Sequence, residues 1–245
     1  MKKNILIAFL LLLANQYGTA QLIDKYGLSI GTTYSNQLWN YKLFSIENPN
    51  KDYKTGLSFF LSAEKEINKA LSIRSELGYL QKGFKNNLEL SLGDGITMGV
   101  RGKNVIFHDL GLNIELKILP FKSKLLPYAL IGFRGDYMLS YKDIVFEEQG
   151  SGLRLNMYES QINEFNKLNL GGLIGIGLEF NDLYYLEFEY NPAITSSFNS
   201  DVLQIKDNCW DLKLGLYINK LIKITKHERT TANYKPGFGA SLAGN

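Results

Sequence analysis

The sequence predicts an all-β fold, namely an eight-stranded antiparallel transmembrane β-barrel with a filled polar interior. Three observations support this prediction. Apolar and polar residues alternate with a period of two in eight long segments, which is typical of β-strands that have one face in an apolar environment. The connections between these segments are alternately short and long, and the chain begins with an export signal.

The N-terminus has the three parts of a secretory signal peptide. Lys2 and Lys3 form a basic region, residues 5–14 are apolar, and Gly18-Thr19-Ala20 supplies small residues before a cleavage site. The apolar run is shorter than the roughly 20 residues that a membrane-spanning helix needs. We therefore expect residues 1–20 to be a signal peptide that is removed on export.

The composition excludes several classes of protein. The formal net charge is +3, and Lys2 and Lys3 account for two of these charges. A nearly neutral mature chain argues against a nucleic-acid partner, which would need a concentrated basic face. Cys209 is the single cysteine, so an internal disulfide framework is excluded.

Eight strands follow from the alternation. We expect them at about residues 26–35, 55–67, 71–85, 105–119, 126–141, 167–180, 183–195 and 205–219. Each has about the 10 residues that a tilted strand needs to cross a bilayer, or more. A barrel of ten strands would result if part of residues 142–166 also paired into the wall.

The connections alternate in length. Three are tight, at residues 68–70, 120–125 and 181–182. The other four, at residues 36–54, 86–104, 142–166 and 196–204, are long and polar. This alternation is typical of outer-membrane barrels, which have short periplasmic turns and long extracellular loops.

Alternation alone does not say which face points outward, because a soluble lipocalin-like barrel alternates too. A charge on the lipid face would cost about 2–4 kcal/mol at the membrane midplane. We therefore expect the charged faces to point inward, where side chains fill an eight-stranded lumen and opposite charges pair. The predicted interior charge network is Glu64, Arg74, Glu76, Glu115, Lys117, Arg134, Asp136, Glu187, Glu189, Asp211 and Lys213.

Aromatic residues lie near the ends of the predicted strands, as in the girdles at the two membrane–water interfaces. One predicted girdle, at the short turns, is Tyr26, Phe121, Tyr128, Phe180 and Tyr184. The other, at the long loops, is Tyr34, Tyr79, Tyr137, Tyr141, Tyr190 and Trp210.

With these patterns the chain resembles the PorT-like outer-membrane β-barrel proteins of Bacteroidetes-type bacteria. The resemblance covers about residues 21–219. It rests on the signal peptide ending TAQ and on the segments YGLSIGTTYS, LSIRSELGYLQKGF, LPYALIGFRGDY and GGLIGIGLEF–ND–LYYLEFEYN. It implies an outer-membrane barrel without one shared activity, although some members of the family are associated with protein secretion.

Catalytic and metal sites are poorly supported. His108 and Asp109 are adjacent, but neighbouring strand residues point to opposite faces, and no nucleophile is recognisable by its spacing. One cysteine and two distant histidines do not form a metal-binding cluster. We therefore expect no enzymatic activity, no cofactor and no metal.

The long loops carry aromatic residues among charged ones, a composition suited to contact with a partner or ligand. These residues are Trp39, Tyr41, Phe44, Tyr53, Phe146 and Tyr158. The alternative is that the loops simply extend the barrel hairpins above the membrane.

The domain organisation is thus a signal peptide (1–20), a barrel (21–219) and a periplasmic C-terminal tail (220–245). The leading hypothesis is a protein of the Gram-negative outer membrane that contacts lipid and has a structural or binding role through its long loops. It could be part of an envelope or secretion assembly, with a protein partner at the loops or the tail. The alternatives are a lipid-modifying enzyme with chemistry at the barrel rim, and a soluble exported lipocalin-like binder.

Overall fold

The computed structural model describes residues 23–43, 51–85, 91–92, 96–101, 104–120, 125–148 and 154–219, without the side chains of 91–92, 96–101, 146–148 and 154–155. The predicted signal peptide and the predicted C-terminal tail lie outside these ranges. None of the described helices is long and apolar enough to cross a membrane.

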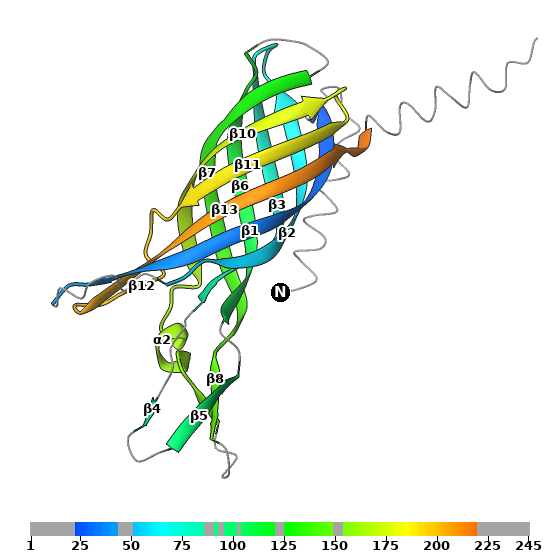
Figure 1. Ribbon diagram of the computed structural model, residues 1–245. Coiled ribbons are helices and arrows are strands. Elements are labelled where there is room, and N and C mark those ends of the chain that lie inside the picture. Colours follow the sequence, from blue (N-terminus) through cyan, green and yellow to red (C-terminus); the bar gives the residue numbers. More distant parts are fainter. Residues whose placement is uncertain are drawn as a thin grey trace, which may run out of the picture.

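Eight long antiparallel strands form a closed ring (Figure 1). Strands that are neighbours in the ring pair in the order β1-β2-β3-β6-β7-β10-β11-β13, and β13 pairs with β1 to close it. The prediction of an eight-stranded antiparallel barrel is therefore confirmed. The strands are β1 (Lys25–Tyr41), β2 (Lys54–Glu66), β3 (Leu71–Lys85), β6 (Asn104–Ile118), β7 (Leu125–Lys142), β10 (Leu168–Phe180), β11 (Tyr184–Pro192) and β13 (Leu203–Tyr217).

The short connections are tight turns at one end of the barrel. β10 and β11 join through Asn181 and Asp182, whose φ angles are 52° and 54°. Two successive left-handed residues make a turn whose twist matches that of paired strands, and Asn and Asp tolerate this conformation. Asn68 organises the turn between β2 and β3, since its Oδ1 accepts a hydrogen bond of 2.8 Å from the N–H of Ala70.

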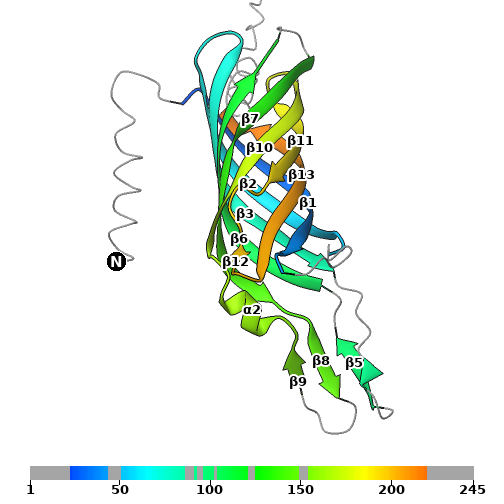
Figure 2. The ribbon, with the colours of Figure 1, turned by 90° about the vertical axis from the view of Figure 1, so that its left-hand side faces the viewer.

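The long connections form structure of their own beyond the other end of the barrel (Figures 1 and 2). Strands β5 and β8, from two different connections, pair within a separate four-stranded sheet. The paired parts of residues 142–166 therefore add no strand to the barrel wall, which has eight strands and not ten. The elements outside the wall are β4 (Ser91–Leu92), β5 (Ile96–Arg101), β8 (Val145–Glu148), β9 (Arg154–Asn156), α2 (Glu159–Asn163) and β12 (Phe198–Asn199).

Some strand ends differ from the prediction. β1 continues to Tyr41 instead of ending near residue 35, and β13 begins at Leu203. Their ladder runs on to the pair Tyr41–Leu203, because Trp39 and Ile205 are buried together in an apolar cluster above the barrel. β11 ends at Pro192, since proline has no N–H to donate to a ladder.

The barrel has its apolar face outward. On β10, Ile174 and Ile176 are 59% and 66% exposed, whereas Glu179 is fully buried. The same division holds for the other strands, where many Leu, Ile and Phe side chains are exposed, while the buried set contains lysines, arginines and carboxylates. A barrel surrounded by the hydrocarbon core of a membrane requires this arrangement. The lipocalin-like alternative, which would have an apolar interior, is therefore wrong.

One aromatic residue was assigned to the wrong face. Tyr128 is only 3% exposed and points into the lumen, so it does not belong to the lipid-facing girdle. It alternates with the outward-facing Ala129 and occupies the space over Gly177. Tyr34, Tyr137 and Tyr184 are 46–49% exposed on the outer face, whereas Phe121 lies outside the described residues.

Candidate functional site

The interior of the barrel is filled by paired charges that come from all parts of the chain. All eleven residues of the predicted interior network lie on the inner face and are buried. They form three groups along the barrel axis, which we call the lower, middle and upper tiers, with the lower tier nearest the short turns.

The lower tier centres on Lys117. Its Nζ lies 2.6 Å from Oε2 of Glu179 and 3.2 Å from Oε2 of Glu64. Lys25 reaches the other oxygen of Glu179 at 2.8 Å, and the hydroxyl of Tyr217 donates to Glu64 at 2.9 Å. These contacts join strands from opposite sides of the ring across the lumen.

The middle tier contains Arg74 and Lys213. Nε and Nη2 of Arg74 donate to Oε2 of Glu115 at 2.9 and 2.7 Å, and its Nη1 donates to Glu187. Nζ of Lys213 lies 2.6 Å from Glu76 and 2.5 Å from Glu189. Two cations thus bind four carboxylates from three strands, and their contacts cross the lumen between β3 and β11, which lie opposite each other in the ring.

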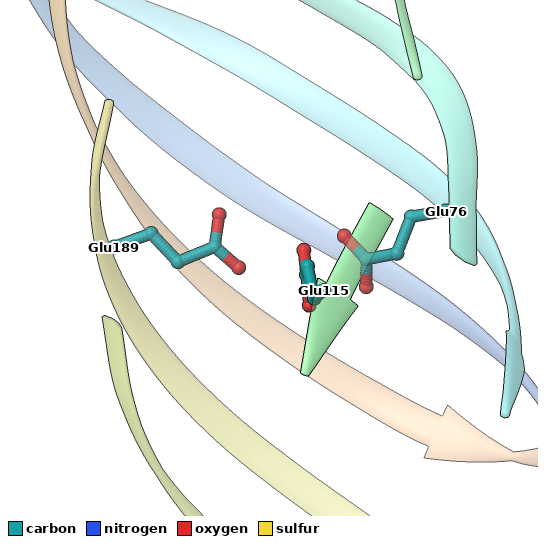
Figure 3. Close-up of side chains that lie close together, drawn as sticks. All are labelled: Glu76, Glu115 and Glu189. Atoms are coloured by element: carbon teal, nitrogen blue, oxygen red, sulfur yellow. The ribbon is translucent and has the colours of Figure 1, made fainter. Parts of the chain in front are cut away.

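Three carboxylates of this tier lie close enough together to suggest a metal site (Figure 3). One oxygen of each of Glu76, Glu115 and Glu189 lies within 4.8 Å of the others. A metal ion bound by such carboxylates would be surrounded by their oxygens. Here the ammonium of Lys213 and the guanidinium of Arg74 already hold these positions, so the cluster is better described as an ion-pair network.

The middle tier has more acids than bases. Asp211 adds a fifth carboxylate, which accepts a hydrogen bond of 2.8 Å from Ser58. Within the described residues, each of the five carboxylates has an oxygen without a hydrogen-bond donor. Excess charge at such a depth is costly, and the two cations Arg74 and Lys213 are shared among four of the five carboxylates.

The upper tier is built around Lys82. Its Nζ lies 2.9 Å from Asp136 and 3.0 Å from Asp109. Nε of Arg134 donates to the other oxygen of Asp136 at 2.9 Å. Lys82 therefore pairs with carboxylates on two neighbouring strands, β6 and β7.

His108 and Asp109 do not form a catalytic pair. The register between β6 and β7 shifts between these two residues, and Asp109 points inward to Lys82. His108 is half-buried on the outer side, with Nδ1 2.6 Å from the hydroxyl of Tyr79. It thus belongs to the aromatic girdle, where its ring stacks on Tyr79.

Glycines on the inner face make room for aromatic rings. A Cβ at Gly177 would overlap the ring of Tyr128, and one at Gly215 would overlap the ring of Tyr185. In the space at Gly177, Tyr128 lies within reach of Glu187, to which its hydroxyl donates at 2.5 Å. The close approach of ring to backbone therefore explains why glycines share this face with long charged residues.

The loop end of the lumen is covered by an apolar cluster, which we call the outer cap. Two of the predicted loop-contact residues, Trp39 and Tyr158, belong to it and are each 6% exposed. Their rings meet edge to face, with centroids 5.6 Å apart. The outer cap consists of Trp39, Phe84, Val105, Phe107, Ile144, Tyr158, Ile162, Phe165, Leu203 and Ile205.

The prediction that Trp39 and Tyr158 are exposed contacts is therefore wrong. Ring packing with Phe84 buries both side chains, and this packing depends on loop conformations that alternation does not reveal. A neighbouring hydrogen bond of 2.8 Å from the N–H of Tyr158 to Asp143 holds the loop in place. Burial raises the pKa of the Asp143 carboxyl, while this hydrogen bond opposes the rise.

The remaining predicted contact residues have different positions. Tyr41 is half-buried against the outer cap, and Tyr53 stacks on Tyr34 with ring centroids 4.4 Å apart. Phe44 lies outside the described residues, and Phe146 lies in β8, where side chains are not described.

Sequence reasoning missed several interior residues. Lys82 and Lys25 have the inward parity of their strands, so alternation could have identified them. Leu80 also points inward and is fully buried. This apolar residue interrupts the polar pattern of the inner face of β3, so Lys82 was not recognised as inward. Tyr185 and Tyr217, both fully buried, were hidden because tyrosine also suits lipid-facing interfaces.

No protein-family model matches the chain, and no curated protein matches it either. The PorT-like resemblance therefore stays a prediction.

Solved structures with a similar arrangement of strands include three bacterial proteins. Ail of Yersinia pestis, solved with the heparin analogue sucrose octasulfate, is 14% identical, with a TM-score of 0.37 over 79% of this chain and 98% of Ail. Neisserial surface protein A is 13% identical, with a TM-score of 0.42 over 78% of this chain and 96% of that protein. The outer membrane protein OprG of Pseudomonas aeruginosa is 10% identical, with a TM-score of 0.40 over 80% of this chain and 97% of OprG.

Proposed function

We propose that the chain is a non-catalytic protein of the Gram-negative outer membrane, with a closed barrel that holds a folded extracellular region for a binding or structural role. The observation that carries the proposal is the double closure of the lumen. Ion pairs of Arg74 and Lys213 cross the middle of the barrel, and the outer cap covers its loop end.

The first closure argues against a pore. Both middle-tier cations are fully buried, and each holds carboxylates on different strands. A path for ions would require these contacts to break, which leaves charges unpaired in a medium of low dielectric constant.

The second closure supports a binding role for the extracellular region. A long loop that only joins two strands has no need of an apolar core, yet α2 and its flanks contribute Ile162 and Phe165 to the outer cap. An ordered surface loses less conformational entropy on binding a partner than a flexible loop does.

Reconstitution into planar phospholipid bilayers tests the closed barrel. We expect no steady conductance above that of protein-free lipid, and a stable open channel in the wild-type protein would contradict the proposal.

The binding role is tested by replacing residues 91–101 and 145–156 with glycine–serine linkers. This change should leave the barrel folded, as judged by heat-dependent gel mobility, and abolish in-cell crosslinking to an envelope partner.

A rim enzyme is the alternative function. Within the part of the chain that the structure describes, its predicted pair is not assembled, since Asp109 and His108 point to opposite sides of the wall. Replacing His108 should therefore change neither the folding of the protein nor the lipid composition of the membrane. A membrane whose lipids change with this substitution would favour the enzyme.

A further inference from the structure

The outer surface of the barrel carries an apolar groove in the half that is nearest the short turns. Its volume is about 570 Å³, which is within the range of small-molecule sites. It crosses several strands of the wall, from β6 to β13. Its outward-facing lining includes Ile118, Ala129, Ile176, Leu178 and Phe188.

The groove exists because a small residue lies among large ones. Ala129 on β7 is paired with Ile118 on β6 and with Ile176 on β10. The branched side chains on both sides stand out from the wall, and the methyl group of Ala129 leaves the space between them open. Leu178, which is half-buried, lies beside this space.

The groove offers an occupant almost no hydrogen bonds. Tyr128 and Glu187 reach its wall, but their polar ends lie in the lumen and bond to each other at 2.5 Å. A peptide strand or a sugar would therefore leave its own polar groups unsatisfied in hydrocarbon, at a large cost. The occupant must be apolar along the whole length of the groove.

We propose that this groove binds one acyl chain of a phospholipid from the periplasmic-facing leaflet. The groove lies between the middle of the barrel and the girdle of Phe180 and Tyr184, so a chain within it would place its headgroup near that girdle. A flexible chain can follow the curved surface, whereas the convex wall of a second barrel would touch only the rims. The proposal rests on embedding in the membrane and is independent of whether the lumen conducts.

Packing is the reason why an acyl chain would stay in the groove instead of exchanging with the surrounding lipid. Other lipid chains are as apolar as the groove, so transfer from bulk lipid brings no hydrophobic gain. An unfilled groove loses dispersion contacts on one side, and a fitted chain restores them. Filling the groove with a protein side chain should therefore displace the lipid.

Native mass spectrometry of the full-length mature protein in mild detergent, titrated with dioleoylphosphatidylethanolamine, tests the proposal. Ala129→Trp fills the groove. Ala63→Trp is the matched control, since Ala63 also faces outward, on β2, away from the groove. We expect one lipid per barrel for the wild type and for Ala63→Trp, and about tenfold weaker binding for Ala129→Trp.

Equal lipid binding by all three proteins would overturn the proposal, because the lipid would then be ordinary surface lipid. A wild-type dimer that Ala129→Trp converts to a monomer would also overturn it, in favour of a second copy in the groove. Heat-dependent gel mobility establishes that each variant is folded. Ala129→Leu, a smaller change, replaces Ala129→Trp if the larger side chain prevents folding, and it should weaken binding in the same direction.

Discussion

Arg74 is the residue whose loss should damage the barrel most. It is fully buried in the middle tier and donates two hydrogen bonds to Glu115, at 2.9 and 2.7 Å, and a further one to Glu187. The substitution Arg74→Met keeps an unbranched side chain in the space and removes the guanidinium. Among the described residues, Glu115 then has no cation as an ion-pair partner.

Removing one partner of a buried ion pair costs about 3–5 kcal/mol, because the other charge stays buried and uncompensated. Uptake of a proton by one carboxylate limits this penalty. We therefore expect the free energy of unfolding to fall by about 3 kcal/mol.

Lys65→Met is the control. Lys65 is 49% exposed and lies 3.2 Å from Asp24 at the short-turn rim, and an exposed pair of this kind contributes about 0–1 kcal/mol. Equilibrium unfolding in urea from phospholipid vesicles, followed by tryptophan fluorescence, measures both variants. A loss below about 1 kcal/mol for Arg74→Met, with an unchanged heat-dependent gel shift, would refute the view that this ion pair holds the lumen together.

Three further predictions concern the interior and the outer cap. Glu115→Gln should lower the free energy of unfolding by less than about 2 kcal/mol in the same urea assay, since it removes one of five middle-tier carboxylates and keeps an acceptor for Arg74. Gly177→Val should lower the free energy of unfolding by about 1–3 kcal/mol, because the larger side chain overpacks against the ring of Tyr128. Gly135→Ala is the control: Gly135 faces outward, where a Cβ would make an ordinary contact, so the free energy of unfolding should hardly change. Equal losses in the two variants would contradict the role of Gly177. Trp39→Ala should lower the free energy of unfolding of the outer cap by about 3–5 kcal/mol and should speed limited proteolysis of the loop after β7. Leu139→Ala is the control, since this side chain is 57% exposed on the outer face, and it should leave the cleavage rate unchanged.

Alternation was sufficient to predict the wall of the barrel. Successive strand residues point to opposite faces, so the apolar parity of each segment assigned its lipid face without knowledge of its neighbours. The same rule placed the eleven predicted network residues inside, although Lys25 and Lys82, which have the same inward parity, were missed. Tyr128 has the inward parity of its strand, and it was misassigned by the argument from aromatic girdles, because tyrosine is common both at a lipid interface and beside a buried carboxylate.

The sequence by itself thus determined the two faces of the strands and the charged character of the lumen, because these depend on local periodicity. It left a wall of eight strands and one of ten open, and the pairing of β8 with β5 outside the wall decided for eight. Only the tertiary structure decided which charges meet: Arg74 and Glu187 are 113 residues apart in the chain, and the closure and stagger of the ring bring them together. The burial of Trp39 and Tyr158 in the outer cap was likewise decided by tertiary packing, since it depends on where two long loops converge. The groove around Ala129 has the same origin, because its shape is set by side chains on five strands, from β6 to β13, that the pairing of the sheet places side by side.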